Sequence, residues 1–193
     1  MGSMMMKAIA RKKTELIENI PKNFFDLSAK DIDGNMIKFC SYKLSDSNKD
    51  GKKAFLVVNV ACDWGLTKNN YKELVELDDK FRDSGLHIMG FPCNQFFAQE
   101  KRPESEIKEY VQEAFDVKFQ LYSKVEVNGE NSHPIYKFLR KNSKLDSGEK
   151  GIKEIPWNFS KFLVNRNGNV IEFYPPTVSP KKISSKIEEL LKN

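Results

Sequence analysis

The chain has 193 residues, of which 39% are hydrophobic and 31% charged, a balance typical of a soluble globular protein. It contains no apolar run of about 18 residues, which excludes a membrane-spanning helix. The net charge of +5 is spread along the chain and indicates a solvated surface, with weak attraction to anionic lipid or acidic substrates as the alternative. Three cysteines without an obvious pairing argue against a disulfide framework and predict a reducing, cytoplasmic location; a mitochondrial or secreted form stays open.

Residues 1–20 are interpreted as a tag remnant followed by an N-terminal extension, and residues 21–193 as a single domain. Residues 7–19 could form a short amphipathic helix or be the end of a trimmed leader. The segment from Phe24 to Phe39 predicts two strands joined by a turn at Asp33-Gly34-Asn35, and residues 45–53 predict a polar loop.

The valine-rich run from Phe55 to Ala61 predicts a buried strand, covered on both faces. A helical pattern begins near Lys68, with Thr67 as a candidate N-cap and Gly85 as a stop. The turn between them lies at the carboxyl end of a strand and the amino end of a helix. Open α/β sheets often carry reactive groups there, and backbone N–H groups favour an anion such as a thiolate.

The rest of the chain continues to alternate strands and helices. The ranges predict a strand (86–91), a helix (104–115), a short strand within 119–127, a helix (132–141, with Pro134 in its first turn), a hairpin (161–174) and a closing helix (180–192). This order favours an α/β fold in which a mixed sheet is flanked by helices.

Most standard sites are absent from the sequence. There is no phosphate-binding glycine loop and no cysteine–histidine cluster with metal spacing, so we expect no bound metal or cofactor. His87 lies inside an apolar strand and His133 at a helix start, where structural roles are expected. The remaining chemistry is redox chemistry at the strand–helix turn, supported by the non-titrating N–H donors of Gln99, Trp157 and Asn158. Each of these three, taken alone, is more often structural.

Several motifs in order resemble the glutathione peroxidase family, from Phe24 to about Leu191. They are Asn59-Val-Ala-x-x-x-Gly-x-Thr67, Phe91-Pro-Cys-Asn-Gln-Phe96 followed by Gln99-Glu100, Asn128-Gly-x-x-x-His133-Pro134, and Trp157-Asn-Phe159. The resemblance implies a thioredoxin fold with an N-terminal β-hairpin. It also implies a catalytic tetrad at position 64, Gln99, Trp157 and Asn158, which reduces hydroperoxides with glutathione as the reducing co-substrate.

The chain departs from the family at the centre of that tetrad. Trp64 stands where members carry selenocysteine or cysteine, and an indole cannot act as the chalcogen nucleophile. Three explanations are open: a natural selenocysteine whose UGA codon differs by one base from a tryptophan codon, an inactivating substitution, or a natural pseudo-enzyme. Members that use thioredoxin carry a resolving cysteine in the region that here spans residues 110–119, which has none. Its absence favours the selenocysteine, glutathione-using branch.

Other residues near the motifs allow further interpretations. Cys62 is interpreted as a small core residue, with a substitute nucleophile or resolver as the alternative. Cys93 and Cys40 are expected to be structural. Phe97 replaces the glycine usual after the Asn-Gln-Phe triplet, which could reshape the rim of the site and alter the placement of Gln99.

The segment from Arg140 to Pro156 is short, which resembles the monomeric phospholipid hydroperoxide type of the family. We therefore expect a monomer that reduces hydrogen peroxide and organic or phospholipid hydroperoxides, contacts membrane surfaces weakly and binds no nucleic acid. Trp64 is expected to disable this chain. The alternatives are a non-enzymatic pseudo-peroxidase or redox scaffold, and a thiol peroxidase that uses Cys62.

Overall fold

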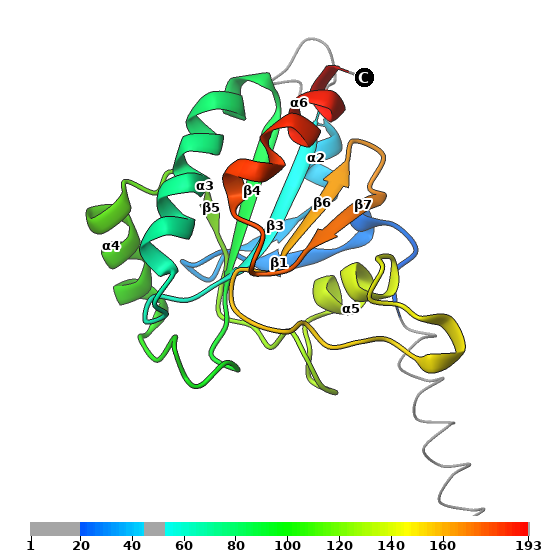
Figure 1. The fold of residues 1–193 in the computed structure, drawn as a ribbon, viewed down its shortest axis with the longest axis horizontal. Helices are drawn as coiled ribbons and strands as arrows, with labels where there is room; N and C mark the ends of the chain where they lie inside the picture. Colours follow the sequence, from blue (N-terminus) through cyan, green and yellow to red (C-terminus); the bar gives the residue numbers. More distant parts are fainter. Residues whose placement is uncertain (1–19, 45–52, 193) are drawn as a thin grey trace, which may run out of the picture.

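The computed structural model describes residues 20–44 and 53–192, and Figure 1 shows a central sheet with helices on both sides. The expectations for residues 1–19 and 45–52 lie outside these ranges. Within the described ranges, none of the helices has the length and apolar character that crossing a bilayer requires.

The central sheet is mixed, with strand order β5-β4-β3-β6-β7. β3 (Ala54–Val60) runs parallel to β4 (Leu86–Pro92), which in turn pairs in parallel with β5 (Gln120–Leu121). On its other side β3 is antiparallel to β6 (Lys161–Asn165), and β6 is antiparallel to β7 (Val170–Tyr174). The mixed α/β sheet predicted from the sequence is confirmed.

β3 is the central strand of the sheet, and all seven of its residues are buried. Successive side chains of a strand point to opposite faces. Phe55 and Val57 accordingly join one hydrophobic cluster, whereas Leu56, Val58 and Val60 join another. β3 therefore packs into a hydrophobic cluster on each face of the sheet. This packing on both faces fixes the position of the carboxyl end of the strand.

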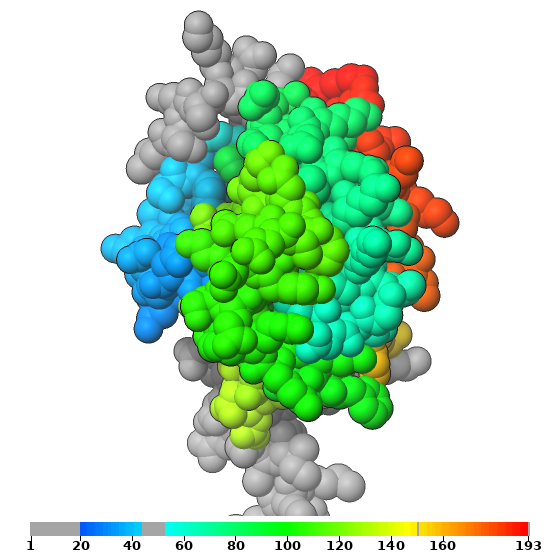
Figure 2. Space-filling view, turned by 90° about the vertical axis from the view of Figure 1, so that its left-hand side faces the viewer, coloured from blue at the N-terminus to red at the C-terminus, as the bar shows by residue number. Residues whose placement is uncertain are grey.

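One face of the sheet is covered by three helices, α3 (Thr67–Phe81), α4 (Glu104–Phe115) and α6 (Ser184–Lys192). Their buried side chains recur at helical spacing, as Tyr71, Leu74 and similar positions do in α3. Figure 2 shows α3 and α4 side by side on this surface.

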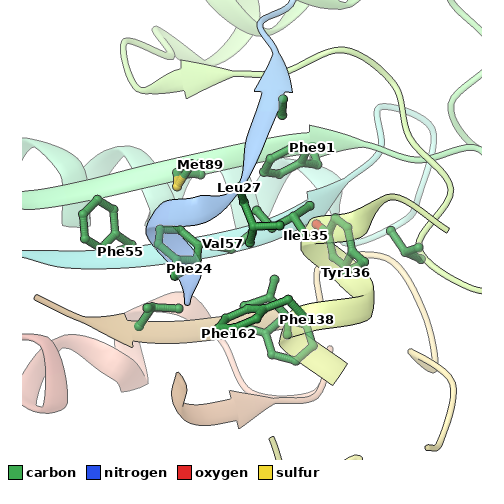
Figure 3. Packing of buried hydrophobic residues seen from close by; sticks show 14 of the residues in the cluster. Phe24, Leu27, Phe55, Val57, Met89, Phe91, Ile135, Tyr136, Phe138 and Phe162 are labelled. Atoms are coloured by element: carbon green, nitrogen blue, oxygen red, sulfur yellow. The ribbon is translucent and has the colours of Figure 1, made fainter. Parts of the chain in front are cut away.

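The other face is covered by α5 (Pro134–Lys141) and by the N-terminal segment with η1 (Phe24–Asp26), β1 (Ser28–Lys30) and β2 (Met36–Lys38). Figure 3 shows the aromatic packing of this cluster; the rings of Phe24 and Phe55, for example, are 5.2 Å apart. β1 and β2 form the antiparallel hairpin that was predicted.

Several boundaries differ from the sequence predictions. The first part of the predicted N-terminal strand is the 3₁₀ helix η1, and a short helix, α2 (Cys40–Leu44), follows β2 without having been predicted. The closing helix begins with a 3₁₀ turn, η4 (Pro180–Ile183). Two further 3₁₀ turns are η2 (Arg82–Ser84) and η3 (Gly148–Lys150). Short 3₁₀ turns are common at helix ends and leave little periodic signal in a sequence.

Candidate active site

The candidate site begins where two parallel strands end together. Val60 is paired with Pro92, so the segments that follow β3 and β4 leave the sheet at the same edge. The Cys93 N–H donates to the Val60 carbonyl oxygen at 3.0 Å and holds the two exits together. Residues 61–67 and 93–100 are therefore neighbours, as the position of reactive groups in open α/β sheets leads one to expect.

The turn that presents position 64 is closed by Thr67. Its Oγ1 donates to the Ala61 carbonyl oxygen at 2.7 Å and accepts from the Trp64 N–H at 3.1 Å. The prediction of Thr67 as N-cap of the helix is wrong by one residue, because Leu66 is the N-cap and has no capping side chain. The threonine instead satisfies the backbone of the turn itself.

The loop after β4 is tied to the rest of the site by backbone and amide bonds. The Asp63 N–H donates to the Gln99 carbonyl oxygen at 3.0 Å. Gln95 Oε1 accepts from the N–H groups of Val127 (2.7 Å) and Asn128 (3.0 Å), which fixes the loop on its other side. Gln99 is thus held from both sides of the loop.

Asn59 holds the segment after residue 156 in place by hydrogen bonds. Its fully buried side chain donates from Nδ2 to the Trp157 carbonyl oxygen (3.1 Å) and accepts at Oδ1 from the Ser160 N–H (3.0 Å). The Asn59 carbonyl oxygen also accepts from the Phe159 N–H at 2.7 Å. A polar residue inside an apolar strand is costly unless it is bonded in this way.

These anchors bring two of the predicted site residues into direct contact. Asn158 Nδ2 donates to Gln99 Oε1 at 2.7 Å, although 59 positions separate the two residues. The bond uses the Gln99 carbonyl as acceptor and leaves its NH₂ group as a donor for a ligand. Asn158 is fully buried, and within the described part of the chain its Oδ1 has no hydrogen-bond partner.

The two tryptophans each pack against phenylalanine rings of the segments that carry the amide pair. Trp64 is half-buried and stacks on Phe159, with ring centroids 5.8 Å apart. Trp157 contacts the rings of Phe96 (5.6 Å) and Phe97 (5.3 Å). Trp64 is connected to Gln99 and Asn158 through the backbone of its neighbours and through Phe159, with no direct bond between their side chains among the contacts of the described residues.

A buried thiol, Cys62, lies two residues before position 64 and close to the buried carboxyl of Glu100. Cys62 is 5% exposed, and burial together with the nearby Glu100 raises the pKa of its thiol well above the usual value. Burial also raises the pKa of the Glu100 carboxyl to about 6. Closer to the surface, Arg102 forms an ion pair with Asp63 at 2.8 Å.

The remaining cysteines and histidines occupy positions apart from the amide pair. Cys93 is fully buried, and burial raises the pKa of its thiol to about 11. Cys40 is exposed. His87 is half-buried and stacked on Phe55 at 5.2 Å, with a pKa lowered to about 4 by burial, and His133 caps α5 by accepting from the backbone. Among the described residues, no group of three or more acidic, cysteine or histidine side chains could hold a metal ion.

Sequence reasoning missed the supporting roles of Asn59, Thr67 and Phe159. Asn59 was noted only as a motif position, although a lone amide inside a valine-rich strand is itself a signal of a bonded anchor, and Thr67 was noted as a motif position and as a candidate N-cap. Phe159 takes a left-handed backbone conformation (φ 57°), which places its ring between Trp64 and Tyr71. No local pattern would have revealed that placement.

The fold, with its candidate site at the ends of β3 and β4, is a thioredoxin fold. Comparison with known proteins shows which family of this fold the chain belongs to. The family model described as "Glutathione peroxidase" matches residues 24–140. The chain therefore belongs to the glutathione peroxidase family.

Individual relatives agree with this assignment over most of their length. The chain is 43% identical over 171 residues to a probable phospholipid hydroperoxide glutathione peroxidase of Mesembryanthemum crystallinum, covering 89% of this chain and 94% of the relative. It is 41% identical over 173 residues to probable glutathione peroxidase 8 of Arabidopsis thaliana, covering 89% and 95%. Among solved structures, the apo form of Trgpx superposes with a TM-score of 0.66 at 35% identity, covering 89% of this chain and 97% of that one.

Proposed function

We propose that this protein derives from an enzyme that reduces hydroperoxides with glutathione, and that Trp64 disables the present chain. The observation that carries the proposal is the hydrogen bond between Asn158 and Gln99, because Asn158 follows Trp157 and Gln99 is bonded to Asp63, the neighbour of position 64. Fixed N–H donors of this kind stabilise a developing negative charge.

The reaction requires a thiolate or selenolate at position 64. Its chalcogen attacks the terminal peroxide oxygen; the bond to that oxygen forms as the O–O bond breaks, and the alkoxide leaves and takes up a proton to become the alcohol. One glutathione displaces water from the resulting sulfenic or selenenic acid. A second glutathione attacks the mixed disulfide or selenenylsulfide, which releases oxidised glutathione and restores the thiol or selenol.

In this scheme the amide and indole N–H groups of Gln99, Asn158 and Trp157 stabilise the anionic chalcogen and the departing alkoxide. They suit this task because they donate hydrogen bonds without titrating near neutral pH. The indole of Trp64 supplies no electron pair that can cleave a peroxide bond in this way. We therefore propose that the natural residue at this position is selenocysteine.

The decisive experiment compares the unmodified chain with Trp64→Cys and Trp64→Ser in a glutathione reductase-coupled assay. Serine matches cysteine in size but cannot be oxidised by peroxide, so it controls for the removal of the indole. We expect a background rate for the unmodified chain and for Trp64→Ser, and clear turnover for Trp64→Cys. A Trp64→Cys protein that is folded but silent with hydrogen peroxide and with a phospholipid hydroperoxide would overturn the proposal.

One observation favours a non-enzymatic role as the second candidate. Trp64 is packed against Phe159 rather than projecting freely, so the indole fills its position as a structural residue does. In a natural pseudo-peroxidase, removal of this stack would destabilise the protein and bring no activity. The activity of Trp64→Cys in the assay above separates this candidate from a disabled enzyme, and thermal unfolding of Trp64→Ser measures what the stack contributes to stability.

The alternative in which Cys62 acts as the nucleophile has less support. The thiol is buried, and its raised pKa keeps it protonated near neutral pH, whereas the reactive species is the thiolate. If residual peroxide reduction is detected in the unmodified chain, Cys62→Ser should leave it unchanged. Loss of that activity in Cys62→Ser would support Cys62 as the nucleophile.

We also propose a substrate class, a cellular location, an oligomeric state and a reductant. The relatives named for phospholipid hydroperoxides favour lipid hydroperoxides as substrates, and the modest positive charge fits weak contact with anionic membranes. We propose that the protein is a cytoplasmic monomer that uses glutathione directly. The absence of cysteine from residues 110–119 supports glutathione over a thioredoxin-like reductant.

A further inference from the structure

Phe97 is the most exposed large hydrophobic side chain of the described residues. Its side chain is 81% exposed, and its backbone has φ 52°, followed by Ala98 with the same value. A bulky residue in the left-handed region carries steric strain, and an exposed aromatic ring gains nothing from burial. Two separate costs therefore coincide at one residue of the loop that carries Gln99.

The ring of Phe97 contacts Trp157, one of the predicted site residues. It lies 5.3 Å from the ring of Trp157, which also contacts the buried Phe96 at 5.6 Å. The two phenylalanines and the half-buried indole form a continuous apolar surface, which we call the aromatic platform. The platform lies next to the Gln99–Asn158 pair, because Trp157 directly precedes Asn158 and Phe97 lies two residues before Gln99.

A second apolar side chain is exposed on the other segment of the site. Among the described residues the exposed large hydrophobic side chains are Met36, Leu66, Phe97 and Ile171. Leu66 and Phe97 lie on the two segments that the bond from Asp63 N–H to the Gln99 carbonyl oxygen joins. Two of these four side chains, including the most exposed one, therefore lie on the segments around position 64, where an apolar ligand would bury them.

Basic side chains follow these apolar residues on both segments. Lys68 comes two positions after Leu66, and Lys101 comes two positions after Gln99; both are exposed. The exposed Asp63 on the first segment is paired with Arg102, so its charge is offset. Exposed cations on segments that also carry exposed apolar side chains complement a ligand with a long apolar chain and one anionic group.

We propose that Phe97 is a specificity-determining residue, and that the aromatic platform takes the acyl chain of a fatty-acid hydroperoxide while its peroxide group reaches position 64. This inference rests on the proposed function and names its substrate class. The strained, exposed ring is retained because it extends the Trp157 surface along the acyl chain. Hydrogen peroxide, which has no chain, makes no use of the platform.

Binding can be tested without turnover. The chain contains two tryptophans, so Trp157 is the only one left in a Trp64→Cys protein and reports on its own surroundings. We expect saturable change of its fluorescence on titration with hydroxy-octadecadienoic acid, kept below its micellar concentration. Adding Phe97→Asn should weaken this binding about tenfold, the loss expected for one large aromatic contact. Asparagine tolerates the left-handed backbone, so the loop is preserved.

Turnover supplies the second readout. The ratio of kcat/KM for octadecadienoic acid hydroperoxide to that for hydrogen peroxide should fall about tenfold in Trp64→Cys/Phe97→Asn relative to Trp64→Cys. Phe97→Gly should give the same fall, since glycine is free of strain at this φ. Trp64→Cys/Met36→Asn, which removes an exposed apolar side chain from β2, is the matched control and should keep the ratio.

An unchanged affinity and an unchanged ratio in the Phe97 variants would overturn the inference. A parallel loss with both peroxides and no change in affinity would also overturn it, because Phe97 would then act by placing Gln99. If Trp64→Cys turns over neither peroxide, the proposed function fails, while the fluorescence titration still decides whether Phe97 binds the acyl chain.

Discussion

The two halves of the candidate active site differ in how they are fixed. The amide half, Gln99 with Trp157 and Asn158, is held by a side-chain hydrogen bond between distant segments and by the buried Asn59. The nucleophile half, residues 61–67, is held by the local bonds of Thr67, and its central side chain only packs against Phe159. Neither set of anchors involves the side chain of Trp64. The geometry of the site is therefore built independently of the residue that would perform the chemistry.

The largest expected effect on activity comes from breaking the amide half. In the Trp64→Cys background, Gln99→Ala removes the acceptor for Asn158 and one donor toward the reacting oxygen. We expect a fall in kcat/KM of about 100-fold, as for the loss of one fixed donor in an anion-stabilising site. The peroxidase assay measures this, with the exposed Gln112→Ala on α4 as control. Equal rates in the Gln99 variant and its parent would show that the amide half is structural.

A second prediction removes the anchor between the halves. Asn59→Ala leaves the Trp157 carbonyl oxygen and the Ser160 N–H without their side-chain partners in a buried position. We expect the free energy of unfolding to fall by about 3 kcal/mol, in line with the cost of unsatisfied buried polar groups. Urea unfolding of the unmodified chain and the variant measures the change. A loss below about 0.5 kcal/mol, within the range of ordinary surface substitutions, would contradict the anchoring role.

The third prediction concerns pH, because the buried carboxyl of Glu100 follows Gln99 of the amide half and lies close to Cys62 of the nucleophile half. The pKa of Glu100 is raised from 4.5 to about 6 in the folded protein. Its neutral form therefore adds stability that is fully present below pH 4.5 and is lost as the pH rises to about 6, a change of about 2 kcal/mol.

Glu100→Gln keeps the neutral form at every pH. The stability of this variant relative to the unmodified chain should accordingly rise between pH 4.5 and 6 and stay constant above. Urea unfolding across this window measures the difference, and Glu106→Gln on the exposed surface of α4 is the control. A difference that does not depend on pH would mean that the Glu100 carboxyl titrates in the folded protein as it does in the unfolded chain.

The smallest effect tests the local bonds of the nucleophile half. Thr67→Val keeps the shape of the side chain but removes the hydroxyl that serves Ala61 and Trp64. We expect a loss of about 1 kcal/mol in the free energy of unfolding, the typical net value of a hydrogen bond. Thr67→Ser, which keeps the hydroxyl, should lose less. If the two variants lose the same amount, the methyl group rather than the turn bond is what matters.

The sequence by itself determined the parts of the protein that depend on local pattern. The valine-rich run gave β3 within one residue, because a strand covered on both faces needs apolar side chains at every position. The range of α4 was predicted without error, since its apolar residues recur at helical spacing and Pro103 precedes it. The motif positions also gave position 64, Gln99, Trp157 and Asn158 as the candidate site residues, because a family motif can be read from the chain without its fold.

Only the tertiary structure decided how those residues meet. The bond between Gln99 and Asn158, the stack of Trp64 on Phe159 and the position of Phe97 over Trp157 join segments that are about 60 to 95 residues apart. Contacts of this kind follow from the packing of strands and loops and leave no periodic trace in the chain. The N-cap of α3 was missed for the same reason, because Thr67 bonds to a turn whose shape the sheet edge imposes.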